Sequence, residues 1–406
     1  MKFSKNIILA ALALAIAGSI WYLEKDKVSP AAGPKEDTTI PFSPELFAEK
    51  PASNTNTDSG REIAGDEPGF QENQNFRSPT EKNIKFPRAK EISLPSGFIN
   101  TPAGFKIADL IGKKVILVDF WTYSCINCQR TTPYLNAWYD KYKDKGLEIV
   151  GVHTPEFDFE KKYDNVVSAV EKLGIKYPVV MDNDYGTWTA YGNSYWPRKY
   201  LIDIDGFIVY DHIGEGAYEE TEKKIQEALE ERMYRLNEQG RVSSELVSPS
   251  GTEATDSKKV YSPEIYFGAF RNQLFGNGIK NQTGEQDLSA PEEDIISNIL
   301  YLSGKWNFAR EYAENKETGA KIIFRYTGNK LYFVASADEE VLIKIKRDGQ
   351  PVSDVAGEDV KKDGTGEAAI KDERLYKIID DSNYGEHTLE IIIENPGLKA
   401  FTFTFG

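Results

Sequence analysis

Val115-Ile-Leu-Val-Asp-Phe-Trp-Thr-Tyr-Ser-Cys-Ile-Asn-Cys-Gln-Arg130 is the stretch that decides the fold of this chain. It begins with a mainly apolar, β-branched run, which predicts a central strand buried on both faces. Apolar side chains then recur at helical spacing until Gly146, a typical helix C-cap; they are Leu135, Trp138, Tyr139 and Tyr142. Cys125 is therefore expected at a helix N-terminus, where unpaired N–H groups and the positive end of the helix dipole favour a thiolate over a thiol.

Cys125 and Cys128 are the only cysteines in the 406-residue sequence, and their spacing lets them form a disulfide. A zinc site needs about four ligands. The chain offers two sulfurs and three scattered histidines, which are His153, His212 and His387. A metal site is therefore the weaker interpretation, and no metal ion or cofactor is expected. A purely structural disulfide stays open, although a bridge closing so small a loop adds little stability in the chain-entropy model. The spacing favours redox chemistry.

The pattern Asp119-Phe-Trp-x-x-x-Cys-x-x-Cys, with Pro133 five residues after the second cysteine, resembles thioredoxin. The longer string that runs on to Arg130 is similar to the thioredoxin-like domain of the DipZ- and TlpA-type extracytoplasmic thiol–disulfide oxidoreductases. The resemblance implies that Cys125 attacks a disulfide and that Cys128 resolves the mixed disulfide. It also implies that Asp119 is the buried carboxylate that exchanges protons with the resolving thiol.

Residues 1–23 are typical of a signal or anchor segment, because Lys2 and Lys5 precede an apolar run over 7–23. That run is at the short limit for crossing a bilayer, which needs about 17–25 residues. The Ala15-Ile-Ala17 triplet offers a cleavage site, so a cleaved signal peptide and a secreted or periplasmic protein stay open. An uncleaved membrane anchor is favoured, because cleavage there would leave apolar residues exposed at the new N-terminus. In both cases we expect the domains to lie outside a bacterial cytoplasm, where thiols meet oxidising conditions.

Composition and periodicity divide the rest of the chain into four parts. Residues 24–83 lack sustained periodicity and predict a disordered linker. Residues 84–236 alternate strands and helices, as an α/β thioredoxin-like domain does, and 237–259 form a second linker. Residues 260–406 predict an all-β sandwich, jelly-roll-like in type. In the α/β domain we expect strands at 115–121, 147–153 and 177–181, helices at 160–173, 185–191 and 218–236, and a hairpin of 198–204 with 207–213 about Asp205-Gly206.

Trp196 and Pro197 stand directly before a predicted strand and are the candidate substrate-binding residues. In thioredoxin-like folds a cis-proline at this place faces the disulfide, and the backbone before it pairs with the substrate chain. The resemblance therefore implies a cis Trp196-Pro197 bond, whereas the residues alone leave a trans proline on an edge strand equally open. Trp121 and Tyr123 flank the cysteines and are candidates for an apolar docking rim, with ordinary packing as the alternative.

Three further polar residues near this region are expected to have no role in catalysis. His153 ends a predicted strand, and a sulfur–histidine metal site resembling those of copper-delivery proteins is less expected than a satisfied strand-end histidine. Glu156 and Asp158 are expected to be solvated loop charges.

A thiol peroxidase is the alternative enzyme, because Thr122-Tyr-Ser-Cys125 fits half of a peroxiredoxin motif. That motif requires a proline where Val118 stands, and Cys128 is too close to be the usual resolving cysteine.

In the C-terminal part, strands are expected at 321–326, 331–335, 341–346, 387–394 and 400–405. The segments Ser303-Gly-Lys-Trp306, Tyr384-Gly-Glu-His-Thr-Leu389 and Phe401-Thr-Phe-Thr-Phe-Gly406 are similar to the carbohydrate-binding-module-like domain that accompanies DipZ-type thioredoxin domains. A sugar site would use exposed aromatic rings, and packing in the core is the simpler use of the available ones. They are Tyr261, Tyr266, Phe267, Phe270 and Trp306.

The net charge of −15 argues against nucleic acid or an anionic membrane surface as a partner. The sequence thus predicts a membrane-anchored, extracytoplasmic thiol–disulfide oxidoreductase that acts as a reductase. Its expected partners are client proteins and a membrane protein that donates or accepts electrons, with a glycan at the C-terminal domain as a weaker expectation. The competing hypotheses are the thiol peroxidase and a glycan- or protein-binding module on a passive thioredoxin platform.

Overall fold

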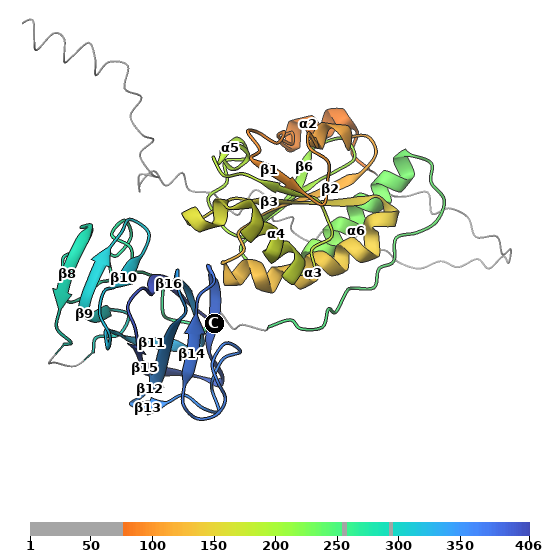
Figure 1. Ribbon diagram of the computed structural model, residues 1–406. Coiled ribbons are helices and arrows are strands. Elements are labelled where there is room, and N and C mark those ends of the chain that lie inside the picture. Colours follow the sequence, from red (N-terminus) through yellow and green to blue (C-terminus); the bar gives the residue numbers. More distant parts are fainter. Residues whose placement is uncertain (1–75, 254–257, 292–294) are drawn as a thin grey trace, which may run out of the picture. The chain divides into compact units, whose positions relative to one another are not determined.

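The computed structural model describes residues 76–253, 258–291 and 295–406 (Figure 1). The predicted anchor at 1–23 and most of the predicted linker at 24–83 lie outside these residues. Within the described ranges, no helix combines the length and the apolar character that crossing a membrane requires.

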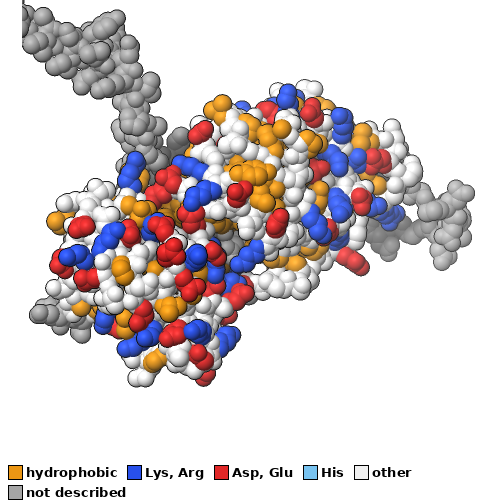
Figure 2. Space-filling view, viewed as in Figure 1, with side chains coloured by type: hydrophobic (Ala, Val, Ile, Leu, Met, Phe, Trp, Pro, Cys, Tyr) orange, Lys and Arg blue, Asp and Glu red, His pale blue; other side chains and the backbone are white. Residues whose placement is uncertain are grey.

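Acidic and basic side chains are interspersed over the face shown in Figure 2. The excess of acidic residues in the sequence is therefore not gathered into one patch on this face. Such a mixed surface differs from the clustered basic surface typical of nucleic-acid-binding domains.

The N-terminal α/β region is built on a mixed sheet of six strands in the order β1-β4-β3-β2-β5-β6. β2, β3 and β4 run parallel, while β1, β5 and β6 pair antiparallel with their neighbours. The strands are β1 (Gly97–Ile99), β2 (Val115–Trp121), β3 (Leu147–His153), β4 (Val179–Met181), β5 (Arg198–Ile202) and β6 (Ile208–Ile213). β2 and β3 match their predicted ranges residue for residue. The three-residue β1 was not predicted, because so short a strand carries no periodicity.

The helices lie on both sides of this sheet, with α3, α4 and α6 on one side and α5 on the other (Figure 1). They are α3 (Ile126–Tyr142), α4 (Tyr163–Lys172), α5 (Gly186–Ala190) and α6 (Tyr218–Arg235). A 3₁₀ turn, Lys143–Lys145, follows α3, and Gly146 caps this turn with φ of 100°, as expected of a C-cap glycine. The predicted helix at 160–173 begins later than expected, because Asp158–Lys161 forms a separate 3₁₀ turn before it.

All seven side chains of β2 are buried, as a strand covered on both faces requires. Leu117 packs in the cluster that contains Trp138 of α3 and Leu229 of α6. Its neighbour Ile116 points to the other face and packs in the cluster that includes Trp188 of α5. The central strand therefore holds the cysteine-bearing helix against a buried, mainly apolar layer.

The predicted disorder of 24–83 is wrong at its C-terminal end, where α2 (Pro79–Lys85) forms. Ser78 and Glu81 make a reciprocal capping box, and proline occupies the first helical turn. The sequence Ser-Pro-Thr-Glu at 78–81 carries that signal, which composition alone hides. The Lys82 ammonium of this helix is buried and donates to three carboxylates. They are those of Asp203 at 2.6 Å, Asp205 at 2.9 Å and Glu231 at 2.5 Å.

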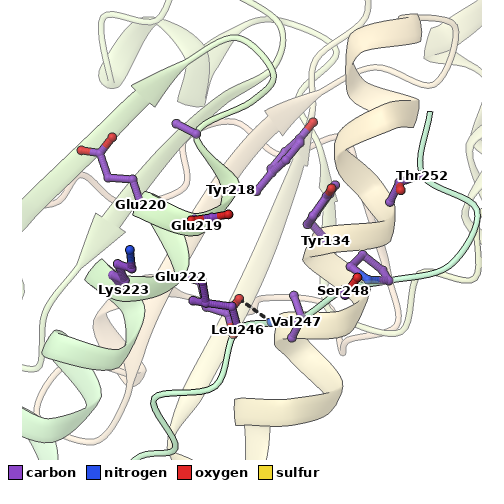
Figure 3. A pocket seen from close by; sticks show the side chains of 12 residues that line it. Tyr134, Tyr218, Glu219, Glu220, Glu222, Lys223, Leu246, Val247, Ser248 and Thr252 are labelled. Atoms are coloured by element: carbon purple, nitrogen blue, oxygen red, sulfur yellow. Dashed lines mark hydrogen bonds between the residues drawn. The ribbon is translucent and has the colours of Figure 1, made fainter. Parts of the chain in front are cut away.

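The second predicted linker lacks helices and strands over its described residues 237–253, but part of it is packed against α6. Val242 is buried in the core of the α/β region. The Val247 N–H donates to Glu222 Oε2 at 2.8 Å (Figure 3). The Gln226 side chain donates to the carbonyl of Glu245 at 3.2 Å. These bonds hold the segment along the helix instead of leaving it as a free spacer.

The C-terminal region is β-rich, as predicted, and its strand pairs are antiparallel. The strands are β7 (Ile265–Tyr266), β8 (Gly284–Leu288), β9 (Leu300–Phe308), β10 (Ala313–Asn315), β11 (Lys321–Ser336), β12 (Val341–Arg347), β13 (Gln350–Pro351), β14 (Glu367–Ile370), β15 (Arg374–Ile393) and β16 (Lys399–Phe405). The strands predicted at 321–326 and 331–335 are one strand, β11. A bulge at Gly328 lets the backbone continue where the sequence suggested a turn.

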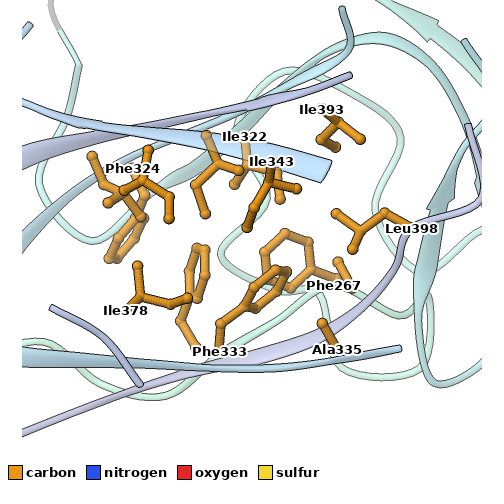
Figure 4. Close-up of a cluster of buried hydrophobic side chains, with 14 of the residues drawn as sticks. Phe267, Ile322, Phe324, Phe333, Ala335, Ile343, Ile378, Ile393 and Leu398 are labelled. Atoms are coloured by element: carbon orange, nitrogen blue, oxygen red, sulfur yellow. The ribbon is translucent and has the colours of Figure 1, made fainter. Parts of the chain in front are cut away.

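The first half of β11 pairs with β9 and β15, and its second half pairs with β15 and β16. Apolar side chains from these strands meet in one core, including Phe324 and Phe333 of β11 and Ile378 of β15 (Figure 4). The jelly-roll-like arrangement itself stays a prediction.

The aromatic residues considered for a sugar site separate by burial. Trp306 and Phe267 are fully buried and belong to the core, so they cannot offer a ring to a ligand. Tyr266 is half-buried and lies under the Arg271 guanidinium, 3.7 Å from its ring centroid. Tyr261 and Phe270 are exposed. The packing alternative therefore holds for Trp306 and Phe267.

Candidate active site

The two cysteines occupy unequal positions at the start of α3. Cys125 is the N-cap residue, and its sulfur accepts a hydrogen bond from the Cys128 N–H at 3.4 Å. Cys125 is half-buried, whereas Cys128 is only 2% exposed, and both are free thiols. An incoming disulfide can therefore reach Cys125 from solvent but not Cys128. This asymmetry agrees with the predicted roles of attacking and resolving thiol.

Asp119 lies within β2 and is buried, and its Oδ1 has no hydrogen-bond partner in the part of the chain that the structure describes. Burial raises the pKa of Asp119 to about 7, and the nearby Lys199 ammonium opposes that rise. Burial, the Cys125 thiol and the charge of Asp119 together raise the pKa of Cys128. A buried carboxyl that titrates near neutral pH thus lies beside a thiol that must lose a proton to react.

Lys199 is a member of this site that the sequence analysis missed. It is the cross-strand partner of Asp119 between β2 and β5, and it is fully buried. Burial lowers the pKa of Lys199, while Asp119 and Cys128 act in the opposite direction. Its ammonium donates to the carbonyl of Gly214 at 3.2 Å. The available signal in the sequence was Lys199 itself, which precedes the apolar run Tyr200-Leu-Ile202 in a predicted strand. A lysine buried in such a strand needs an opposite charge nearby.

Replacing Asp119 with asparagine is expected to reduce the pH dependence of stability. Because folding raises the pKa of this carboxyl, the wild-type protein loses stability as pH rises from about 4, where the unfolded chain ionises, through about 7. That loss amounts to at most about 4 kcal/mol. Urea unfolding at pH 4.5 and pH 8 should show a smaller difference in Asp119→Asn, with Lys199, left without its counter-charge, offsetting part of the gain at pH 8. An unchanged difference would contradict the assignment.

The Trp196-Pro197 peptide bond is cis, as the resemblance implied. Phe120 of β2 is the cross-strand partner of Arg198, so Pro197 lies at the same end of the sheet as the cysteines. The Trp196 indole donates to the Thr154 carbonyl at 3.0 Å. The Pro197 carbonyl accepts from the Gly214 N–H at 2.8 Å, which ties it to the loop between β6 and α6.

Trp121 and Tyr123 do not form an exposed docking rim, because both side chains are buried. Tyr123 stacks on the ring of His153, with centroids 5.7 Å apart, and its hydroxyl donates to the carbonyl of Glu373 at 3.1 Å. Trp121 packs edge-on against the same histidine. The packing alternative therefore holds for both residues.

His153 is fully buried at the end of β3, and burial lowers its pKa to about 3. It is therefore neutral at physiological pH. Its Nε2 lies 3.4 Å from the Thr122 hydroxyl. Over the described residues, no group of three or more histidine, cysteine, aspartate or glutamate side chains is placed to hold a metal ion.

The prediction of a solvated loop charge is wrong for Glu156 and fits Asp158. The Glu156 carboxylate pairs with Arg271 at 2.8 Å and accepts from the Tyr266 hydroxyl at 2.9 Å. Asp158 is exposed, and its ion pair is with the neighbouring Lys161. Glu156 is thus a structural ion-pair partner of a distant segment, which spacing within the loop cannot reveal.

Glu160 is a second residue that the sequence analysis missed. Its buried carboxylate accepts from the Ser124 hydroxyl at 2.6 Å and from the N–H groups of Glu156 and Phe157. Burial raises the pKa of Glu160. These bonds fasten the turn that precedes Cys125 to the 3₁₀ segment after β3. Glu160 is one of three acidic residues between 156 and 160, and nothing in the local sequence distinguishes it from the other two.

A groove of about 820 Å³ opens between the start of α6, Tyr134 of α3 and residues 246–252. The rings of Tyr134 and Tyr218 stack there with centroids 3.6 Å apart (Figure 3). Its lining contains none of the predicted site residues, so the groove is separate from the thiol pair.

Both regions of the chain are similar to known proteins. The Redoxin family model matches residues 85–229, and the model described as "Thioredoxin like C-terminal domain" matches residues 262–406. Protein DipZ of Mycobacterium tuberculosis is 35% identical over 316 residues, which cover 77% of this chain and 42% of that protein. The chain thus spans less than half the length of this relative.

A second relative is shorter and is covered more fully. Thiol-disulfide oxidoreductase ResA of Bacillus anthracis is 37% identical over 133 residues, covering 30% of this chain and 74% of ResA. A solved structure of a thiol:disulfide interchange protein from Bacteroides sp. is 27% identical, with a TM-score of 0.29; the match covers 34% of this chain and 89% of that one.

Proposed function

Because the chain belongs to the DipZ/TlpA-type family of thioredoxin-like thiol–disulfide oxidoreductases, we propose that it reduces disulfides in exported client proteins through Cys125 and Cys128. The observation that carries the proposal is the pairing of an accessible thiol at the N-cap of α3 with a buried thiol beside a buried carboxyl. A structural disulfide or a passive platform has no need for a proton acceptor behind the second cysteine.

The first step is attack by the Cys125 thiolate on one sulfur of the client disulfide. A bond forms between Cys125 and that sulfur, the client S–S bond breaks, and the second client sulfur leaves as a thiolate that takes a proton from solvent. The N-terminus of α3 supports this step, since the Cys128 N–H donates to the Cys125 sulfur that attacks.

In the second step Cys128 gives its proton to the Asp119 carboxylate and attacks the Cys125 sulfur. The mixed disulfide breaks, the client leaves as a thiolate that is then protonated, and Cys125 and Cys128 are left joined as a disulfide. Two electrons have passed from the enzyme to the client. Asp119 fits this role because a carboxyl with a pKa of about 7 can both accept and release a proton near neutral pH.

The client chain is proposed to lie along the backbone at Trp196, beside the cis-proline. Pro197 is at the same end of the sheet as Cys125, and the Trp196 side chain is fixed by its bond to Thr154 and by packing on Trp188, 4.3 Å away between centroids. An extended client segment there would bring its disulfide to the only cysteine that solvent reaches among the described residues.

The proposal extends to partners and to location. Each turnover leaves the cysteines oxidised, so an electron donor must reduce them again outside the cytoplasm, and a membrane protein is the proposed source. Residues 1–23 are the proposed anchor that keeps the enzyme near it. Glycan binding by the C-terminal region depends on exposed rings, of which Tyr261 and Phe270 are available.

The decisive experiment measures the reduction potential of the Cys125–Cys128 pair in the full chain, equilibrated against glutathione and dithiothreitol, together with insulin reduction. A reductase is expected to have a potential near that of thioredoxin, about −270 mV, and to reduce insulin with dithiothreitol as the electron source. A potential near about −120 mV would reverse the proposed direction. A full chain that leaves insulin oxidised under these conditions would refute the activity.

A further inference from the structure

Arg130 is a buried cation two residues beyond Cys128 that the reaction steps above do not use. Its Nε and Nη2 donate to the two carboxylate oxygens of Glu215, each at 2.8 Å, in a bidentate pair. Nη2 also donates to Asn127 Oδ1 at 2.7 Å. Asn127 stands between the two cysteines. One guanidinium therefore contacts the residue inside the C-x-x-C turn and a residue 85 positions further along the chain.

Glu215 belongs to the 214–217 loop, which connects β6 to α6. Gly214, Gly216 and Ala217 all have positive φ, at 82°, 88° and 46°. Positive φ is uncommon for alanine, so contacts with the rest of the fold must help to hold the loop in this conformation. The Gly214 N–H donates to the Pro197 carbonyl at 2.8 Å. Lys199, the partner of Asp119, donates to the Gly214 carbonyl. The loop thus touches both the proline site and the lysine of the proton-transfer pair.

Burying the Arg130 guanidinium costs desolvation energy, which suggests that the Arg130–Glu215 pair serves to orient the elements that it joins. Arg130 is only 5% exposed, and its Nη1 has no hydrogen-bond partner among the described residues. Taking a guanidinium out of water is expensive, and an apolar pair of similar size often stabilises a fold equally well. A bidentate arginine–carboxylate pair, by contrast, fixes the relative orientation of the two elements that carry it.

We propose that Arg130 and Glu215 are positioning residues that hold the 214–217 loop, and through it the Trp196-Pro197 backbone, in register with Cys125 for protein clients. The inference rests on the proposed function and adds to it the residues that align a bound chain with the attacking sulfur. The connection runs from Asn127 through Arg130 to Glu215, and then along the loop to Gly214 and the Pro197 carbonyl.

The pair bonds to neither sulfur, so its loss should affect docking more than thiol chemistry. A protein disulfide must be placed by its flanking chain before Cys125 can attack, and a small misplacement of a docked reactant is costly. A small aromatic disulfide such as 5,5′-dithiobis(2-nitrobenzoate) needs no such docking. The two substrates therefore separate a positioning role from a general loss of activity.

The test uses the full chain with Glu215→Gln and Arg130→Lys. Glu238→Gln is the matched control, because Glu238 makes the same kind of bidentate pair with Arg232, at 2.6 and 3.0 Å, beyond the other end of α6. In both test variants kcat/KM for insulin should fall about 10-fold, mainly through KM, while the second-order rate with the small disulfide stays within about twofold. The control should change neither value.

Two outcomes would overturn the inference. Equal losses with insulin and with the small disulfide would show that the pair supports the thiols or the fold in general, and unchanged insulin kinetics would show that it positions nothing. Thermal melting of each variant identifies a folding defect, and Glu215→Gln, which removes charge without changing side-chain size, is the milder of the two changes. If the unmodified chain reduces neither substrate, the proposed function itself fails, and this inference falls with it.

Discussion

Cys125→Ser is expected to abolish insulin reduction, with a fall in rate of at least about 10³-fold. Cys125 is the only cysteine of the two that solvent reaches, and a serine hydroxyl at the α3 N-cap cannot attack a disulfide at neutral pH. The buried Cys128 cannot take over the attack, because a client disulfide has no path to its sulfur. The measurement is the initial rate of insulin reduction with dithiothreitol, after subtraction of the uncatalysed rate.

Cys128→Ser is the matched control and should behave differently. The first step remains possible, but no second thiol is present to release the client, so a mixed disulfide between Cys125 and an insulin chain should accumulate. Mass spectrometry under non-reducing conditions detects it as the summed mass, which disappears after reduction. Retention of near wild-type turnover in Cys125→Ser would refute the assigned order of attack, and so would a mixed disulfide between Cys128 and an insulin chain in that variant.

Lys82→Met is expected to destabilise the protein by about 3–5 kcal/mol, the usual cost of removing one partner from a buried ion pair. The Lys82 ammonium lies among the carboxylates of Asp203, Asp205 and Glu231, and its side chain is only 4% exposed. Without it, Arg235 is the cation that still contacts these carboxylates within the described ranges, at 3.5 Å from Asp205 and 3.1 Å from Glu231. Chemical unfolding at pH 7 measures the loss.

The pH profile of the same variant distinguishes this mechanism from a simple packing defect. Without the Lys82 ammonium, three carboxylates crowd a mostly buried site with one cation fewer, and their mutual repulsion is relieved when low pH adds protons to them. The gap between Lys82→Met and wild type should therefore narrow at low pH. Lys85→Met, on an exposed position of the same helix, should stay within about 0.5 kcal/mol of wild type. A gap that is constant with pH would contradict the ion-cluster explanation.

The thioredoxin-like part was predictable wherever the signal was local. β2 and β3 are apolar runs bounded by clear breaks, and α3 carries an apolar stripe that ends at Gly146. The C-x-x-C pair needs only its own spacing and the N-terminus of that helix. β11 shows where this reasoning stops, because the sequence at its centre resembles a turn while the paired strands on either side keep it extended.

The chain by itself therefore determined the central strands, the cysteine-bearing helix and the identity of the two thiols, since all of these depend on residues within one or two turns of each other. Only the tertiary structure decided which charges meet. Lys82 finds Asp203 across 121 residues, and Lys199 faces Asp119 because β5 lies beside β2 in one particular register. Burial, too, is a property of the whole fold, and it is burial that raises the pKa of Asp119 to about 7 and conceals Trp121, Tyr123 and Trp306. A side chain's type is fixed by sequence, but its solvation and its partners exist only once distant segments have packed together.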